Sequence, residues 1–431
     1  MKTAQEYKDS IRKLNPVVYA YGKKIEQVAD HPTFAPTLNS VALTYRMAKE
    51  TENENLMTVK SPFTGKMINR FLHICQSPED LIKRCELSKF LTPFHGACVG
   101  ARCVGTAALN TLYALTCDID RKKRTDYHQR FLKFLSYVQN EDLTCSGMVT
   151  DAKGDRSLGP GQQEDPDVYL RVIEEREDGI VVRGAKAHQS GAALAHFNLV
   201  VPTTSMKENE KEFAVAFAVP SNAPGMIHIA ETPAPNARRL LENDEMDFGN
   251  FEYGVHGSTL VVFNDVFIPR KRVFMCGEYE FAGAMAATFG TFQRLATAGC
   301  KSGHCDLTYG AAAVAAEYNG CDKLSHIRDK IVEMSFQSAL AFGTAIAAGY
   351  KAKATASGVY LPDDLLVNAA KLQAVNAVWM ASKLACEIAG GVICTVPSQK
   401  DFDNPEIAQY VDKYFKGRAD ISTENRVRIM R

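Results

Sequence analysis

MVTDAKGDRSLGPGQQEDPDVYLRVIEEREDGIVVRGAKAHQSGA, residues 148–192, is the stretch of this sequence that decides the fold. It opens with a polar, glycine-containing loop and then alternates apolar and polar residues with a period of two, which is typical of half-buried β-strands. Strand-like runs separated by Gly, Asn, Asp and Pro continue to about Phe274; they are FNLVVPTT, EFAVAFAVP and STLVVFNDVFIP. The centre of the chain is therefore expected to be a β domain.

The segments on either side of this β domain have helical periodicity. Apolar residues recur at three- and four-residue spacing up to about Leu143, and Ser77 followed by Pro78 is typical of a helix start. From Glu278 onward the pattern is again helical and rich in alanine, which favours close packing in a bundle. This order predicts an α+β protein with a helical domain at 1–143, a β-barrel-like domain at 144–275 and a helical bundle at 276–431.

Charge and composition exclude several classes of protein. Lysine plus arginine equals aspartate plus glutamate at 50 each, so no global field directs the chain to nucleic acid or to an anionic membrane. No segment approaches about 18 uninterrupted apolar residues, and the N-terminus is charged where a signal peptide is apolar. Twelve cysteines without a secretion signal indicate free thiols or metal ligands rather than disulfides. We expect a cytoplasmic protein.

A resemblance to a known family rests on the quoted stretch and on four shorter passages. These are INRF (68–71), NDVFIP (264–269), YNG (318–320) and IAGG (388–391). Together they make the chain similar to the 4-hydroxybutyryl-CoA dehydratase branch of the 4-hydroxyphenylacetate 3-hydroxylase superfamily. The resemblance implies an acyl-CoA dehydrogenase-like fold, an FAD between the β domain and the bundle, an acyl-CoA substrate and a homotetramer. It also implies that the last helices of the family are missing after Arg431.

The residues that the resemblance places around the flavin lie in three short segments. The Thr150–Arg156 loop offers backbone donors and two cations for negative groups, although its composition also suits a plain surface turn. Ser190 matches the family's hydroxyl residue near the flavin N5, and the two glycines after the last long helix equally suit a C-cap turn. The full set is Thr150, Lys153, Asp155, Arg156, Lys186, His188, Gln189, Ser190, Gly390 and Gly391.

The dehydratase branch also carries a [4Fe-4S] cluster held by three cysteines and one histidine. The resemblance maps the cysteines to Cys98, Cys103 and Cys300, but Gln293 stands where the family has its histidine. His304 or Cys305 is then the candidate fourth ligand. Four residues separate Cys98 from Cys103, so in a regular helix they would point about 140° apart and an irregular turn would be needed. A cluster and a cluster-free protein with cysteines in its core both stay open.

Three reactions and one non-enzymatic role are compatible with these residues. With a cluster, the resemblance implies radical dehydration of a hydroxyacyl-CoA such as 4-hydroxybutyryl-CoA, with Gln293 and Lys301 at the catalytic positions. Without a cluster, it implies a double-bond shift in a substrate such as vinylacetyl-CoA, or hydroxylation of a phenol by reduced flavin from a separate reductase. A truncated relative that serves as a scaffold would bind no flavin.

Overall fold

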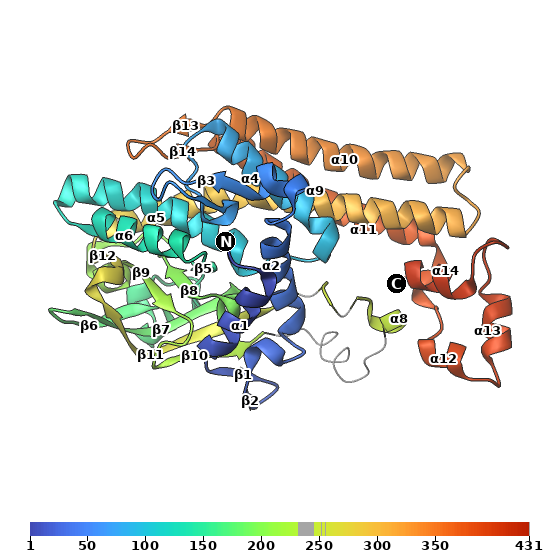
Figure 1. Ribbon diagram of the computed structural model, residues 1–431, viewed down its shortest axis with the longest axis horizontal. Helices are drawn as coiled ribbons and strands as arrows, with labels where there is room; N and C mark the ends of the chain where they lie inside the picture. The colour runs from blue at the N-terminus through green and yellow to red at the C-terminus, as the bar shows by residue number, and fades with distance from the viewer. Residues whose placement is uncertain (232–244, 251, 255, 431) are drawn as a thin grey trace.

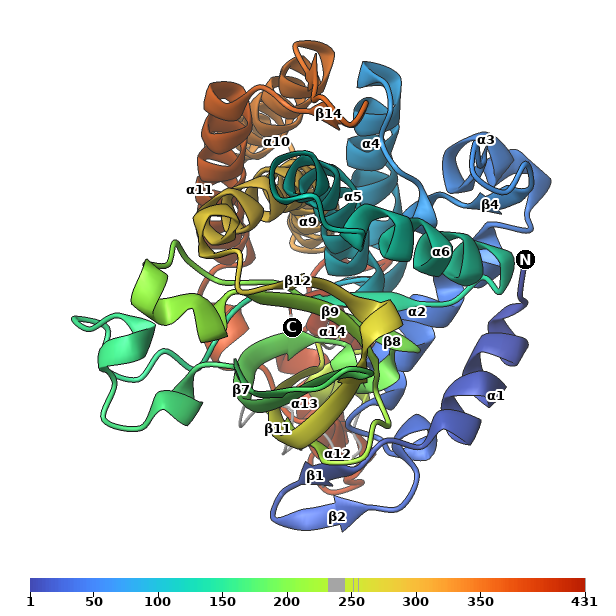
Figure 2. The same ribbon diagram turned by 90° about the vertical axis from the view of Figure 1, so that its left-hand side faces the viewer.

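The computed structural model describes residues 1–231, 245–250, 252–254 and 256–430 and has the predicted order of helices, strands and helices. Figure 2 shows the long helices on one side of the molecule with the β-strands beneath them. Figure 1 shows the three short C-terminal helices at the end of the bundle that points away from the sheets. The α+β, acyl-CoA dehydrogenase-like fold predicted from the sequence is confirmed by this architecture.

The N-terminal segment is mainly helical. Its fourth helix begins where the sequence predicts, because the Ser77 side chain accepts a hydrogen bond from the Asp80 backbone N–H and Pro78 takes the first helical position. The segment also contributes strands, and one of them pairs in parallel with a strand of the central domain. Its elements are α1 (Ala4–Leu14), β1 (Val18–Ala20), β2 (Lys23–Ile25), α2 (Ala35–Met47), α3 (Glu54–Met57), β3 (Thr58–Lys60), β4 (Met67–Asn69), α4 (Pro78–His95), α5 (Ala101–Lys123) and α6 (Tyr127–Asn140).

Two sheets form the centre of the molecule. The larger has the strand order β2-β1-β10-β11-β7-β6 and the smaller has the order β12-β9-β8-β5. Their inner faces meet at Phe217 and Phe263, whose ring centroids lie 6.1 Å apart, and both rings are buried. The strands are β5 (Cys145–Met148), β6 (Arg171–Glu175), β7 (Gly179–Ser190), β8 (Phe197–Val200), β9 (Val215–Pro220), β10 (Met226–Ala230), β11 (Ser258–Pro269) and β12 (Val273–Cys276).

The C-terminal bundle packs through small residues. Ala341, Ala345, Ala370 and Ala374 are all fully buried, so neighbouring helices approach closely, as alanine-rich sequences favour. The helix α10 is also long and apolar enough to cross a membrane by length and composition alone, but only 28% of its apolar window is buried. The elements are α8 (Glu245–Phe248), α9 (Ala282–Tyr318), α10 (Ser325–Tyr350), β13 (Lys353–Ala354), β14 (Tyr360–Leu361), α11 (Asp364–Ala389), α12 (Gln399–Asp403), α13 (Ala408–Tyr414) and α14 (Thr423–Met430).

One close approach brings the larger sheet and α5 together. Gly191 follows β7 with φ 62°, and a Cβ at this position would lie 2.6 Å from the backbone nitrogen of Ala101, the first residue of α5. Any larger residue would push the helix away from the strand. The end of β7 therefore lies directly against the start of α5, where the first candidate cysteines are found.

Candidate active site

A buried ion pair holds the loop that follows β5. Lys186 Nζ lies 2.9 Å from Asp151 Oδ1 and also donates to the carbonyl oxygens of Val149 at 2.9 Å and Val201 at 3.1 Å. Burial raises the pKa of Asp151 and lowers that of Lys186, while each charge opposes the shift of its partner. All three ammonium donors are used. Lys186 therefore positions the loop, and the geometry does not support the predicted direct contact with a cofactor.

Beyond this ion pair, the Thr150–Arg156 loop lines a cavity of about 560 Å³. Its lining includes the cations Lys153 and Arg156, the acid Glu210 and the three hydroxyl residues Thr203, Thr204 and Ser205. Lys153 has φ 74°, a left-handed conformation that a non-glycine residue rarely adopts and that costs about 1–3 kcal/mol. Asp155 caps the turn by accepting from the Ser157 N–H at 2.9 Å. Most of the loop is exposed, so it is a surface turn that carries two cations at the rim of the cavity.

The end of β7 runs alongside this loop. The carbonyl oxygen of Thr150 accepts from the Ala187 N–H at 2.9 Å and from Gln189 Nε2 at 3.0 Å. His188 is exposed, has φ 59° and places Nδ1 3.1 Å from Glu231 Oε1. These contacts fix the Gln189 amide under the loop and direct the His188 imidazole towards Glu231.

A histidine that the sequence did not single out completes this side of the site. His256 precedes β11, whose Ser258 pairs with Ser190, and His256 Nε2 lies 2.9 Å from Ser190 Oγ. Burial lowers the pKa of His256, and the positive charge of Lys301 lowers it further. The imidazole is therefore neutral at pH 7 and can accept a proton. No local pattern in the sequence indicates this contact, because it arises from the pairing of β7 with β11.

The three candidate cysteines converge from two helices. Cys98 lies in the turn before α5, Gly100 precedes the helix with φ 58°, and Cys103 lies in the first turn. Cys300 lies in the middle of α9. Burial raises the pKa of Cys300, and the neighbouring thiols Cys103 and Cys98 raise it further. The predicted irregular turn is present, and it brings all three thiols into one region.

The fourth ligand position is occupied by a poor metal donor. Gln293 on α9 places Nε2 3.5 Å from Cys103 Sγ, so this amide hydrogen-bonds the thiol. The His304 side chain forms a hydrogen bond within its own helix, because its Nδ1 lies 2.9 Å from the backbone carbonyl oxygen of Cys300. Cys305 is buried in a separate hydrophobic cluster of the bundle with Ile327 and other residues. Cys305 is therefore a small core residue.

These donors do not fit a [4Fe-4S] cluster. Such clusters take four thiolate or imidazole ligands, whereas the site offers three thiols and an amide. Within the described ranges, no three His, Cys, Asp or Glu side chains lie close enough together to hold one metal ion. The predicted set Cys98, Cys103, Cys300 and His304 is therefore not arranged as a ligand shell in the described part of the chain.

Gly390 and Gly391 lie apart from these segments. Gly390 caps α11 with φ 75°, and its N–H donates to the Cys386 carbonyl oxygen at 3.0 Å. Neither glycine has another residue within 4 Å of the position of a Cβ, so both are open to solvent. The neighbouring Ala389 packs with Ala315 and Met430, at the end of the bundle shown on the right in Figure 1. Within one chain they act as a C-cap turn.

Comparison with known proteins identifies relatives along the whole chain. Residues 3–275 match the family model "4-hydroxyphenylacetate 3-hydroxylase N terminal", and residues 282–431 match the corresponding C-terminal model. The 4-hydroxybutyryl-CoA dehydratase/vinylacetyl-CoA-Delta-isomerase of Clostridium aminobutyricum is 42% identical over 100% of this chain and 89% of its own. The oxygenase component of 4-hydroxyphenylacetate 3-monooxygenase from Thermus thermophilus is 25% identical over 100% of this chain and 87% of its own.

Solved structures give the same order of similarity. An oxygen-tolerant archaeal 4-hydroxybutyryl-CoA dehydratase from N. maritimus superposes with a TM-score of 0.96 at 40% identity, covering 100% of this chain and 85% of its own. An oxygenase component of 4-hydroxyphenylacetate 3-monooxygenase complexed with FAD superposes with a TM-score of 0.87 at 24% identity, covering 100% and 88%. The second likeness shows the fold alone.

Proposed function

We propose, because this chain belongs to the 4-hydroxyphenylacetate 3-hydroxylase family, that it is a cytoplasmic flavin-dependent enzyme of the dehydratase/isomerase type acting on an acyl-CoA. Of the two reactions named for its 42% identical relative, the geometry best supports the shift of a double bond in an enoyl-CoA. The observation that carries this choice is the 2.9 Å contact between Ser190 Oγ and His256 Nε2. A double-bond shift needs only groups that take and return a proton.

The residues around the cavity fit an FAD molecule. Lys153 and Arg156 offer positive charge for its phosphates, and Thr203–Ser205 offer hydroxyl donors. Ser190 lies at the end of β7, where its hydroxyl can bond the flavin ring. Bound there, FAD supplies a planar electron-accepting ring beside the substrate. Lys186 and Asp151 act indirectly, because their ion pair fixes the loop that carries the cations.

The proposed proton steps use Ser190, His256 and Lys301. A proton leaves the carbon next to the thioester carbonyl and passes to Ser190 Oγ, while the hydroxyl proton of Ser190 passes to His256 Nε2. The C–H electron pair moves into the thioester as an enolate, which the positive charge of Lys301 stabilises. Return of one proton at the far end of the allyl unit gives the conjugated thioester, so atoms and charge balance without any net redox change.

Dehydration of a hydroxyacyl-CoA is the other reaction of the dehydratase/isomerase type. In the family that reaction uses the iron-sulfur cluster, and the donor set here does not fit one. No step of the proposed mechanism therefore passes through iron, and Gln293 acts as the hydrogen-bond partner of Cys103 rather than as a base. Equal rates with 4-hydroxybutyryl-CoA and vinylacetyl-CoA would contradict this choice.

Hydroxylation of a phenol is a second candidate. One observation favours it: Gln293 stands where the dehydratases have their histidine ligand, and an oxygenase needs no iron ligand there. Supply of reduced flavin, oxygen and 4-hydroxyphenylacetate tests it directly. Formation of a catechol, without any change in an added enoyl-CoA, would replace the isomerase proposal.

We also propose that the exposed side of the bundle packs on further copies of this chain, giving a homotetramer. Phe336 and Leu340 lie four residues apart on α10, and Leu372 and Trp379 lie seven apart on α11, so each pair shares one helix face. Their exposed fractions are 49%, 45%, 61% and 74%. Such a face would bring Gly390 and Gly391 within reach of a partner's cofactor. Mass photometry tests this, and a monomer in detergent-free buffer would contradict it.

The test of the proposed activity follows the absorbance of a conjugated enoyl thioester as FAD-loaded protein acts on vinylacetyl-CoA. We expect conversion by the wild type and by Ser190→Thr, which keeps the hydroxyl. Ser190→Ala should lose most of the rate with little change in flavin content. An unchanged rate in Ser190→Ala, or no conversion by the wild type, would contradict the proposal.

A further inference from the structure

A second cavity, outside the candidate active site, is dominated by positive charge. It has a volume of about 700 Å³ and lies between α6, the start of β8 and the short 3-10 helix Arg270–Arg272. Nine side chains line it, of which five are lysine or arginine, one is acidic and three are aromatic. Cavities of about 300–1,000 Å³ are typical of small-molecule sites. This volume is therefore sufficient for a ligand of nucleotide size.

The single acid in the cavity neutralises only one of the five cations. Asp126 forms an ion pair with Arg130, and Arg130 Nε donates to Asp126 Oδ2 at 3.0 Å. Arg270 donates to backbone carbonyl oxygens, those of Glu177 and Arg176, which carry no charge. The other three cations of the cavity are Lys133, Lys271 and Arg272. In the ranges that the structure describes, none of them forms an ion pair with a carboxylate. The cavity thus has excess positive charge.

Arg272 is the most informative of these cations. Its guanidinium lies over the Phe197 ring, 5.2 Å from the centroid, and burial lowers its pKa. An arginine that is partly removed from water without an acidic partner is unfavourable, and a bound anion would offset that cost. Tyr137 meets the same Phe197 ring edge-on at 6.1 Å and is 51% exposed. The cavity therefore combines an unneutralised guanidinium with an accessible aromatic ring.

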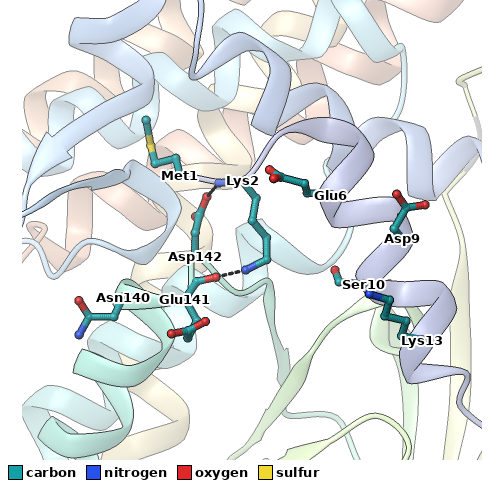
Figure 3. A pocket seen from close by; sticks show the side chains of 9 residues that line it. All are labelled: Met1, Lys2, Glu6, Asp9, Ser10, Lys13, Asn140, Glu141 and Asp142. Carbon is teal, nitrogen blue, oxygen red and sulfur yellow. Dashed lines mark hydrogen bonds between the residues drawn. The ribbon is translucent and has the colours of Figure 1, made fainter.

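Another cavity of similar size has the opposite balance of acidic and basic residues. It has a volume of about 540 Å³ and is lined by residues of α1 and of the end of α6. Figure 3 shows Lys2 pointing towards Asp142 and Glu141, and the Lys2 backbone N–H donates to Asp142 Oδ2 at 2.9 Å. Acids outnumber lysines there, with Glu6 and Asp9 facing the same space. Its charges hold the N-terminus in place and leave no excess for an anion.

We infer that the cavity beside α6 binds a phosphorylated nucleotide. The phosphates lie against Lys133, Lys271 and Arg272, and the base stacks on Tyr137 beside Phe197. Charge-assisted bonds to phosphate suit arginine and lysine, and stacking on an aromatic ring suits every base. The same chemistry is presented by the nucleotide end of a CoA thioester and by a free nucleotide, and the experiment distinguishes these two sources.

The binding test uses calorimetry with the FAD-loaded full chain and three probes: ADP, adenosine and inorganic phosphate. We expect ADP to bind and adenosine not to bind, with ADP affinity falling as salt rises. The double variant Lys133→Gln/Lys271→Gln removes two surface charges without opening the core and should weaken ADP binding by at least about tenfold. The matched control Lys2→Gln/Lys13→Gln removes two lysines at the other cavity and should leave ADP binding unchanged.

Two results would overturn the inference. One is equal ADP affinity in the wild type and in Lys133→Gln/Lys271→Gln; the other is binding of phosphate as tight as that of ADP, which would leave no role for the base. The source is identified by kinetics. A rise in KM for the CoA thioester in the same variant, with kcat unchanged, assigns the cavity to the substrate. An unchanged KM assigns it to a free nucleotide. The binding arm is independent of the proposed reaction.

Discussion

The two sides of the candidate active site are built differently. On the β7 side, the loop is fixed by a fully bonded buried ion pair, and Ser190 is held against a neutral imidazole. On the α9 side, three thiols gather without forming a ligand shell, and the fourth position holds an amide. The α9 side lacks the donor set that a cluster requires. We therefore propose that flavin binding and proton transfer take place on the β7 side.

The largest expected effect comes from breaking the ion pair on the β7 side. Lys186→Met leaves the Asp151 carboxyl buried without its partner and should lower the free energy of unfolding by about 3–5 kcal/mol. Urea denaturation of the flavin-free protein measures this. The double variant Lys186→Met/Asp151→Leu removes both charges and should recover most of the loss. A loss below about 1 kcal/mol in the single variant would mean that the loop is held by other contacts.

The second largest effect is expected on the isomerisation rate when His256, the proposed proton acceptor, is replaced. His256→Asn keeps a polar side chain but cannot accept a proton at neutral pH, so the isomerisation rate should fall by about 10²–10⁴-fold. Flavin content and unfolding free energy should change little, because His256 lies before the start of β11 and is exposed rather than packed in the core. Retention of more than half of the wild-type rate would exclude His256 from proton transfer.

A smaller effect is expected when Lys301 on α9 is replaced, because its positive charge lowers the pKa of His256 on the β7 side. Burial and Lys301 both lower the pKa of His256 below its ordinary value of 6.5. The neutral, active form therefore persists at pH 7, and activity is lost only as the pH falls through the lowered pKa. Lys301→Gln removes one of the two causes and should move this acid limb to higher pH in a pH–rate profile. An unmoved limb would show that another group sets it.

The smallest effect is expected on the α9 side. Cys103→Ser keeps a hydrogen-bonding group beside Gln293 and should change the unfolding free energy by less than about 2 kcal/mol. Flavin content and isomerisation rate should stay close to those of the wild type. If Cys103→Ser abolished activity while His256→Asn did not, the roles of the two sides would be reversed.

Much of the fold could be predicted from local patterns in the sequence. The change of period near Cys145 and again near Glu278 matches the observed change from helix to strand and back. The first strands of the larger sheet, Val18–Ala20 and Lys23–Ile25, were not predicted. They are only three residues long, and the pairing of β1 with β10 and of β2 with β1 depends on contacts that no local pattern contains.

The site was predicted less completely for a similar reason. The proposed role of His256 depends on its contact with Ser190, and that contact arises from the pairing of two strands far apart in the sequence. The spacing of Cys98 and Cys103 indicates that an irregular turn is needed, but only the structure shows that this turn lies at Gly100, before the helix. Lys186 was interpreted as a cofactor contact because its partner Asp151 becomes its neighbour only in the folded chain. Sequence patterns indicated the segments, whereas the partners were set by tertiary structure.

The most direct test of the central claim compares iron content with isomerisation in protein purified without oxygen. We predict one flavin per chain, iron well below one per chain, and conversion of vinylacetyl-CoA that is unchanged after treatment with a chelator. About four irons per chain, the content of a [4Fe-4S] cluster, with activity that falls in proportion as iron is removed, would contradict it.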